Sequence, residues 1–480
     1  MMLTISEEEK KNIFKCLNEL NICNRCILRY LGYNICEHGI DTFLNSGCII
    51  NELFHIDEES CNENKKLKKN PCRSCLNVLD DTVIENYASV ITDEFEKYDI
   101  QNFYTTLNFP VSISIREFGM FLYLKEKFPD IYKQFIHIEK IKRVFRTITS
   151  NTFSLKLKRP FKEDSNLQLN INIVYQDEEK EMENLVKVIT AKKISKKTID
   201  DFLNLCSDEV FKKHFPIPPA IQDKETSATV NFSSSIAFLG GRYLKFSREM
   251  GQTPFIVNNT PITEHSVQEV IFDSIAKVLK CDKQKLTFSA SGREDSDTRM
   301  LGEGRPFYIQ IDDPLFEKIT PQQCQDIEQI ISQSNTVVVI KLQQVSQEST
   351  KKIKFGEQEK RKHYRALCKS LAPNVENAIS TVNLMICPLA IQQATPIRVL
   401  HRRTHLIRER LISEIKATPV EGYSNLFYLD VITEAGTYVK EFVNGDFHRT
   451  NPNLCDTTGY PVDVVALDVT AVELDWPCKN

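Results

Sequence analysis

Along the first half of the chain, apolar side chains recur mostly at the spacing of amphipathic helices. Near the N-terminus, Ile13, Phe14, Leu17 and Leu20 fall on one helical face. Further helices are predicted near residues 81–97, 114–127 and 197–205. Alternating apolar and polar residues predict two strands, at 153–158 and 167–174. This half therefore mixes helices with strands.

The second half has more strand-like runs. Residues 235–246 predict a strand interrupted by Gly240 and Gly241, and Ser266 begins a helix with one apolar face. A proline-rich segment, 214–228, precedes this half and indicates a domain boundary. The remaining predicted elements are strands at 286–288, 307–311, 336–343 and 426–432, a helix at 321–332 and an edge strand at 464–476.

Composition places the chain among globular proteins without a membrane span. It has 480 residues, of which 41% are hydrophobic and 26% charged. No apolar run reaches the ~18 residues of a membrane helix, and the acidic N-terminus is unlike a secretory signal. The net charge of −4 gives the whole chain no attraction for nucleic acid, so any such binding depends on local basic patches.

Fifteen cysteines are scattered along the chain, which favours free thiols and an intracellular location, the nucleus, the cytoplasm or both. Two CxxC motifs, Cys23 with Cys26 and Cys72 with Cys75, offer four thiolates for a tetrahedral Zn²⁺ site. Their separation exceeds the usual ~15–20 residues of a zinc ribbon, and ordinary buried cysteines are the alternative. Rival ligands in the same segment are Cys36, His38, Cys48 and Cys61.

The loop between the strands at 286–288 and 307–311 interleaves acids and bases. A charged loop is often only a solvated surface. Here each carboxylate stands beside cations, which suits a site that keeps one carboxylate ionised. The loop carries Gly292, Arg293, Glu294, Asp295, Asp297, Arg299, Gly302, Glu303, Gly304 and Arg305.

Residues 291–307, SGREDSDTRMLGEGRPF, resemble the catalytic loop of the archaeal and eukaryotic tRNA pseudouridine synthases known as the pseudouridine synthase ten family. The resemblance implies that Asp295 is the catalytic nucleophile, with Asp297 the neighbour most easily confused with it. Tyr364, in the run Lys-His-Tyr-Arg-Ala-Leu, matches the tyrosine that stacks on the target base. Without the resemblance, Tyr364 is equally a core aromatic.

The segment Gly-Thr-Tyr-Val-Lys, residues 436–440, also resembles the family. The resemblance implies that Val439 packs under the site and that Lys440 pairs with Asp295. Whether Asp295 attacks C1′, attacks the base or takes a proton from the sugar stays open. The family also binds zinc through its two cysteine motifs, which implies structural Zn²⁺ at Cys23, Cys26, Cys72 and Cys75. No organic cofactor is expected, because the isomerisation transfers no electrons.

Two loops match the RNA-gripping loops of the family. One runs from Thr253 to Ser266, and the other, here called the arginine-rich loop, runs from Gln393 to Arg408. Arginines interleaved with apolar residues inside a folded domain favour phosphate contacts over a solvated surface. The individual residues predicted to contact RNA are Arg242, Lys245, Arg248, Arg293, Arg398, His401, Arg402, Arg403, Arg408 and Arg449.

The fold class expected is α+β: a pseudouridine synthase catalytic domain on a mixed, largely antiparallel sheet flanked by helices, after a zinc-containing accessory domain. The resemblance to the family implies a zinc segment at 1–80, a THUMP-like RNA-binding domain at 81–215, a linker at 216–228 and the catalytic domain at 229–480. The basic cluster at 140–146 fits either RNA contact or a solvated helix face.

The resemblance implies that the chain isomerises uridine to pseudouridine in the T-loop of tRNA, at positions 54, 55 or both, the positions that the family modifies. The expected partners are the T-arm of tRNA and other structured RNAs, with no membrane, and the chain is expected to be a monomer. One alternative is an RNA-binding or RNA-processing factor that works without catalysis. Another is a zinc-dependent protein adaptor, which the cations of the arginine-rich loop disfavour.

Overall fold

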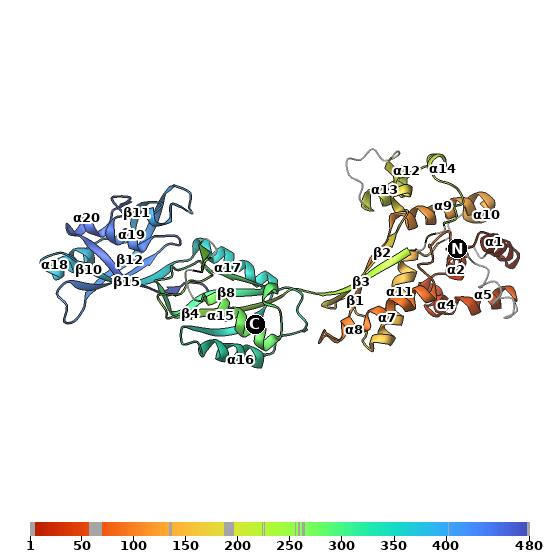
Figure 1. Cartoon of the computed structure of the whole chain (residues 1–480). Coiled ribbons are helices and arrows are strands. Elements are labelled where there is room, and N and C mark those ends of the chain that lie inside the picture. Colours follow the sequence, from red (N-terminus) through yellow and green to blue (C-terminus); the bar gives the residue numbers. More distant parts are fainter. Residues whose placement is uncertain are drawn as a thin grey trace. The chain divides into compact units, whose positions relative to one another are not determined.

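The computed structural model describes residues 5–56, 70–133, 137–186, 196–222, 224, 226–254, 256–257, 260–261, 265–401 and 403–477. The chain divides into two compact units, Met1–Ser234 and Ser235–Asn480, which Figure 1 shows in colours that follow the sequence. Within the described part, none of the helices combines the length and the apolar character needed to cross a membrane.

The first unit packs helices around a small sheet with the order β1-β2-β3 (Figure 1). The larger of its apolar cores extends from Ile13 to Phe232, so the cysteine-bearing segment belongs to the same body as the rest of this unit. Its strands are β1 (Tyr104–Asn108), β2 (Leu167–Tyr175) and β3 (Thr226–Ser234). Its helices are α1 (Glu7–Glu19), α2 (Asn24–Tyr30), α3 (Ile35–His38), α4 (Asp41–Leu44), α5 (Ser46–Phe54), α7 (Asp81–Val90), α8 (Thr92–Phe95), α9 (Val111–Lys127), α10 (Pro129–Tyr132), α11 (Ile141–Leu157), α12 (Glu178–Val186), α13 (Lys196–Leu205) and α14 (Asp208–His214).

Two details of the first unit differ from the sequence prediction. The strand predicted at 153–158 is wrong, because these residues form the last turn of α11. Phe153 and Leu157, one helical turn apart, are buried, whereas Leu155 between them is 74% exposed. The strand β3 pairs with β2, so residues up to Ser234 complete the first sheet rather than begin the second domain.

The second unit is organised around a ten-stranded sheet with the order β14-β11-β12-β13-β10-β15-β8-β4-β9, in which β7 also pairs with β8. Its strands are β4 (Ala237–Lys245), β5 (Ile256–Val257), β6 (Thr260–Pro261), β7 (Leu286–Ala290), β8 (Arg299–Ile311), β9 (Val337–Val345), β10 (Lys362–Ser370), β11 (Leu389–Ala394), β12 (Ile407–Pro419), β13 (Leu426–Thr433), β14 (Thr450–Asn451) and β15 (Val462–Val472). Its helices are α15 (Val267–Leu279), α16 (Pro321–Ser332), α17 (Gln347–Glu359), α18 (Val375–Asn383), α19 (Val439–Asn444) and α20 (Leu454–Thr458).

The C-terminal strand β15 occupies the middle of this sheet, so the prediction of an edge strand is wrong. It pairs antiparallel with β10 and parallel with β8, through Asp468 and Val469. The other pairings described in this sheet are antiparallel. The architecture is therefore α+β with a mixed, largely antiparallel sheet, as predicted.

Two large apolar cores lie along the sheet, one beneath α15 and α16 and the other beneath α18 and α19, and a smaller cluster includes Trp476. Tyr364, on the central strand β10, packs against both cores. The loop between β7 and β8, the arginine-rich loop between β11 and β12, and the start of α19 reach this junction. Residues far apart in the sequence therefore meet around Tyr364.

Candidate active site

The second residue of the 291–298 loop between β7 and β8 has a backbone conformation that favours glycine. Gly292 has a φ of +82°, and a Cβ there would lie 2.8 Å from Nζ of Lys362. The loop then closes on itself, because the Thr298 amide donates to the Asp295 carbonyl at 3.1 Å. These constraints fix the backbone on both sides of Glu294.

Glu294 anchors the loop from inside the protein. Its carboxylate is completely buried and accepts hydrogen bonds from Arg305 Nε at 2.7 Å and from the Tyr243 hydroxyl at 2.9 Å. The side-chain amide of Gln252 donates to the Tyr243 oxygen at 2.7 Å and to the Gly292 carbonyl at 2.9 Å. A buried carboxylate needs such partners. The side chain of Asp295, the next residue, is partly exposed and takes no part in this buried network.

Lys245 fastens the same loop, and its prediction as an RNA contact is wrong. The side chain is fully buried, and its ammonium group donates to the carbonyls of Met250 at 2.6 Å, Asp295 at 3.1 Å and Ser296 at 3.0 Å. All three N–H groups of the ammonium are therefore used within the protein. Burial lowers the pKa of Lys245 to about 8.

Arg242 is a second predicted RNA contact that the structure corrects. Its guanidinium group is buried and donates to four backbone carbonyls. Burial also lowers its pKa. Because those carbonyls belong to β8 and to the end of the chain, Arg242 holds the C-terminal segment in place. The accepting carbonyls are those of Glu303, Val472, Leu474 and Trp476.

The residues predicted to act in catalysis line one cavity of about 370 Å³. Asp295 comes from the 291–298 loop, Tyr364 from β10, and Val439 and Lys440 from the start of α19. Arg398, from the arginine-rich loop, completes this group. The Asp295 side chain is 33% exposed, so its carboxylate is accessible from the cavity.

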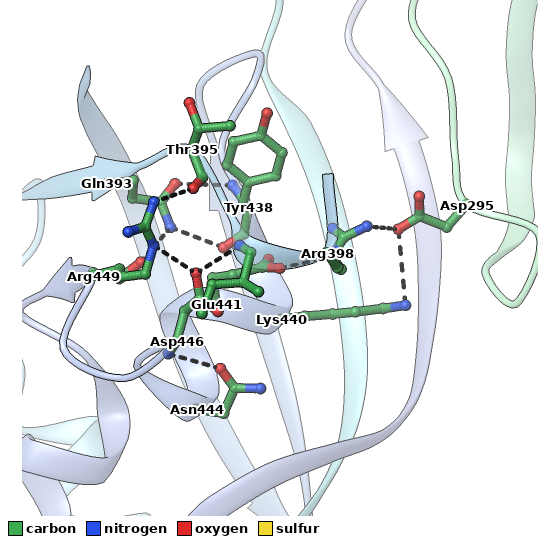
Figure 2. A network of polar contacts seen from close by, with 12 residues as sticks. Asp295, Gln393, Thr395, Arg398, Tyr438, Lys440, Glu441, Asn444, Asp446 and Arg449 are labelled. Atoms are coloured by element: carbon green, nitrogen blue, oxygen red, sulfur yellow. Dashed lines mark hydrogen bonds and ion pairs between the residues drawn. The ribbon is translucent and has the colours of Figure 1, made fainter. Parts of the chain in front are cut away.

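Among the described residues, Arg398 lies closer to Asp295 than Lys440 does (Figure 2). Arg398 Nη1 donates to Asp295 Oδ2 at 2.8 Å, whereas Lys440 Nζ lies 3.8 Å from the same oxygen. Lys440 thus forms an ion pair with Asp295, and it also donates to both carboxylate oxygens of Asp297, at 2.9 and 2.7 Å. Burial by itself would raise the pKa of Asp297. The hydrogen bond from Lys440 outweighs burial, so the pKa of Asp297 lies below its ordinary value.

Tyr364 is half-buried at the junction of the two cores and lines the cavity. Burial raises the pKa of its phenol to about 12. The ring therefore carries a neutral hydroxyl at physiological pH. A neutral aromatic surface beside a carboxylate is suited to stacking against a planar base.

The other predicted RNA contacts fall into three groups. Four are exposed: Arg293, His401, Arg403 and Arg408. Arg248 and Arg449 bond within the protein, Arg248 to Asp468 at 2.6 Å and Arg449 to the Thr395 carbonyl at 2.6 Å. Arg402 and much of the loop from Thr253 to Ser266 lie outside the described residues.

The four predicted zinc ligands come together in the first unit. The sulfur atoms of Cys23, Cys26, Cys72 and Cys75 all lie within 4.8 Å of one another. Cys23 Sγ and Cys75 Sγ are 3.6 Å apart, close to the roughly 3.8 Å between sulfurs that bind one tetrahedral Zn²⁺ at ~2.3 Å. The residues therefore fit a metal ion. The rival Cys61 lies outside the described residues.

Comparison with known proteins identifies the family. Residues 238–473 match the family model described as Pus10, C-terminal, and residues 72–231 match Eukaryotic Pus10, N-terminal. A Drosophila melanogaster Pus10 protein is 32% identical over 98% of both chains, and the Homo sapiens protein named tRNA pseudouridine synthase Pus10 is 32% identical over 92% of this chain and 85% of its own. The chain belongs to the Pus10 family. The Pus10 protein of the archaeon Thermofilum pendens is 30% identical, over 52% of this chain and 55% of its own.

Both Pus10 family models cover parts of the sites described above. The C-terminal model includes every residue that lines the cavity, and the N-terminal model begins at Cys72. Sequence reasoning did not assign roles to Glu294, Arg305 or Glu441, which are buried around the cavity. A signal was present for two of them, because Glu294 precedes Asp295 and Glu441 follows Lys440.

Proposed function

We propose that this chain, like the Pus10 relatives whose names describe them as tRNA pseudouridine synthases, isomerises uridine to pseudouridine in tRNA. One observation carries the proposal. An accessible carboxylate, Asp295, opens into a cavity that also presents the aromatic ring of Tyr364 and the cations Arg398 and Lys440. The cavity volume of about 370 Å³ lies within the ~300–1,000 Å³ typical of small-molecule sites.

The reaction needs few groups, and the cavity contains them. The bond between N1 and C1′ breaks, the uracil turns, and C5 bonds to C1′. The proton on C5 is then released and N1 takes up a proton, so no electrons are gained or lost overall. Asp295 is the proposed nucleophile, and the ring of Tyr364 stacks on the uracil after it leaves the RNA helix. Stacking of this kind stabilises a bound base by ~1–3 kcal/mol. Val439 supports the floor of the cavity.

The proposed substrate site is the T-loop of tRNA, at positions 54, 55 or both. Arg403 and Arg408, which are exposed in the arginine-rich loop, and Arg293 beside the cavity are placed to contact phosphates. A target base in a loop costs less to unstack than one in a helix, because fewer neighbours hold it. The exposed cations and the cavity together favour a looped RNA substrate.

The cysteine cluster is proposed to hold one structural Zn²⁺. Four thiolates close the coordination of the metal, which is typical of structural rather than catalytic sites. The Cys23 amide also donates to Cys72 Sγ at 3.3 Å, and the buried Arg29 donates to Cys26 Sγ at 3.5 Å. These donors suit sulfurs that carry negative charge. The metal when bound would link the start of α2 to the turn at 72–75.

Incubation of the purified chain with unmodified tRNA tests the function. Carbodiimide treatment followed by reverse transcription is expected to give a new stop in the T-loop. Binding of tRNA without any new stop would contradict the proposed catalysis and would favour a binding or processing factor. A stop outside the T-loop would retain the activity and overturn the proposed position.

A further inference from the structure

Glu441 is a buried carboxylate beside the cavity that has no part in the chemistry proposed above. It lies on α19 directly after Lys440, and its side chain is 5% exposed. Its Oε1 atom accepts a hydrogen bond from Arg398 Nε at 2.6 Å. Its Oε2 atom is buried and has no hydrogen-bond partner among the described residues. Since a buried carboxylate is costly without a cation, the contact with Arg398 is the feature that stabilises it here.

Arg398 joins Glu441 to the catalytic carboxylate (Figure 2). Its Nε binds Glu441, while its Nη1 donates to Asp295 Oδ2 at 2.8 Å. The guanidinium group is planar and rigid, so fixing the direction of Nε also fixes the direction of Nη1. The guanidinium carbon also lies 6.0 Å from the centre of the Tyr438 ring, which supports the same orientation.

The chain just before Arg398 is fastened to the segment that carries Glu441 (Figure 2). The Gln393 side chain exchanges two hydrogen bonds of 2.9 Å with the Tyr438 backbone. The Ile397 amide donates to Asp446 Oδ2 at 3.2 Å, and Arg449 donates to the Thr395 carbonyl at 2.6 Å. Arg398 is therefore held at its backbone and at its head group.

We propose that Glu441 is a positioning residue for the isomerisation, acting through Arg398 on the carboxylate of Asp295. Lys440 does not replace this arrangement, because its ammonium group bonds to Asp297 and lies 3.8 Å from Asp295. The proposal rests on the proposed function. It states how the catalytic carboxylate is oriented before RNA binds, which lowers the cost of reaching a reactive geometry.

The test compares Glu441→Gln with the wild-type chain in single-turnover assays on unmodified tRNA. The neutral amide keeps the size of the side chain but binds a guanidinium group less strongly than a carboxylate does. We expect the rate to fall roughly 10-fold or more, since small errors in placing reacting groups cost up to ~100-fold. The Kd for tRNA should stay unchanged, because Glu441 is buried away from solvent. Glu376→Gln, at an exposed position on α18, is the matched control.

A double-mutant cycle shows whether Glu441 acts through Arg398. In an Arg398→Ala background, Glu441→Gln should cause no further loss of rate. A further loss there, a wild-type rate in Glu441→Gln, or a change in Kd alone would each overturn the proposal. If Glu441→Gln fails to fold, Arg398→Lys tests the same link between Glu441 and Asp295. A lysine ammonium group does not reproduce the separate contacts that Nε and Nη1 of Arg398 make with these two carboxylates. A wild-type rate in Arg398→Lys would overturn this link.

The outcomes separate this inference from the proposed function. If the wild-type chain forms pseudouridine and Glu441→Gln does so at the same rate, only the positioning role of Glu441 is overturned. A wild-type chain that folds and binds tRNA without forming pseudouridine removes both proposals.

Discussion

Two carboxylates in the 291–298 loop, Asp295 and Asp297, have different surroundings although only one residue separates them. Asp295 lines the cavity with its side chain 33% exposed. Asp297 is 62% exposed and is held by both of its oxygens to Lys440. These surroundings favour Asp295 over Asp297 as the proposed nucleophile, because Asp297 is already bound to Lys440.

Substitution of each aspartate by asparagine should separate these roles. Asp295→Asn is expected to lower the single-turnover rate at least ~1,000-fold, since loss of a nucleophile typically costs this much or more. Asp297→Asn should lower it less than ~10-fold, because an exposed ion pair contributes only ~0–1 kcal/mol. Tritium release from labelled uridine measures both rates. Equal losses in the two variants, with tRNA binding intact, would contradict the assignment of Asp295.

The sequence predicts which residues lie together at the cavity better than it predicts how buried each residue is. The motif around Asp295 and the run containing Tyr364 are local in sequence, and the structure brings both to one cavity. The exposure of an arginine is not local. Arg242 is buried because it bonds to Leu474 and Trp476, more than 230 positions away. No pattern near Arg242 contains that information.

At the scale of elements, the accuracy of the sequence prediction depended on local stop and start signals. The helix α16 matches its prediction because Thr320 caps it and Pro321 occupies its first turn. The end of α11 was mistaken for a strand, since apolar residues at 153, 155 and 157 alternate as they do in a strand. The strand β15 was recognised as a strand, but its central place depends on pairing with β8, which is distant in sequence.

Lys245, which joins β4 to the 291–298 loop, should make the free energy of unfolding depend on pH. Lys245 has a folded-state pKa of about 8 because it is buried, against an ordinary value of 10.5. Between these values the unfolded chain binds more protons than the folded one, so the contribution of Lys245 to the free energy of unfolding rises with pH from about 8 to 10.5. As the pH falls through 8, that contribution is lost.

Comparison with Lys245→Met isolates this effect. The difference in free energy of unfolding, wild type minus variant, should increase between pH 8 and pH 10. Urea unfolding followed by fluorescence reports on the second unit, because the single tryptophan, Trp476, is buried there and donates to the carbonyls of Gly241 and Phe307. A difference that stays constant with pH would show that Lys245 keeps its ordinary pKa.

The arginine-rich loop should contribute to RNA affinity through charge. Arg403→Ala and Arg408→Ala are each expected to weaken tRNA binding and to reduce the slope of log K against log salt concentration by about 1. Both side chains are exposed, so their loss should not lower stability. Lys354→Ala, an exposed lysine on α17, is the control with unchanged slope. An unchanged slope in both arginine variants would remove the loop from the RNA contact surface.

At the scale of the whole molecule, the two units differ in what stabilises them. The second unit has a long sheet with large apolar cores along it. The first has a short sheet, and three of its four clustered cysteines, Cys26, Cys72 and Cys75, belong to its core. A metal at this cluster would cross-link the start of α2 to the turn at 72–75, which are distant in sequence. Loss of the metal should therefore lower the stability of the first unit more than it lowers the reaction rate at Asp295.

Zinc removal tests this division. The purified chain is expected to contain one zinc per molecule, released to a metallochromic dye after thiol modification. Binding of structural zinc supplies ~10 kcal/mol or more in small domains, and each 1 kcal/mol shifts the midpoint of a domain of this size by ~2–4 °C. Cys75→Ser should therefore lower the first-unit midpoint, followed by calorimetry, by more than ~10 °C. Cys324→Ser, at a buried cysteine of the second unit, is the control and should keep the same zinc content as the wild type. A zinc-free wild-type chain whose midpoint equals that of Cys75→Ser would show that the four thiols are only core residues.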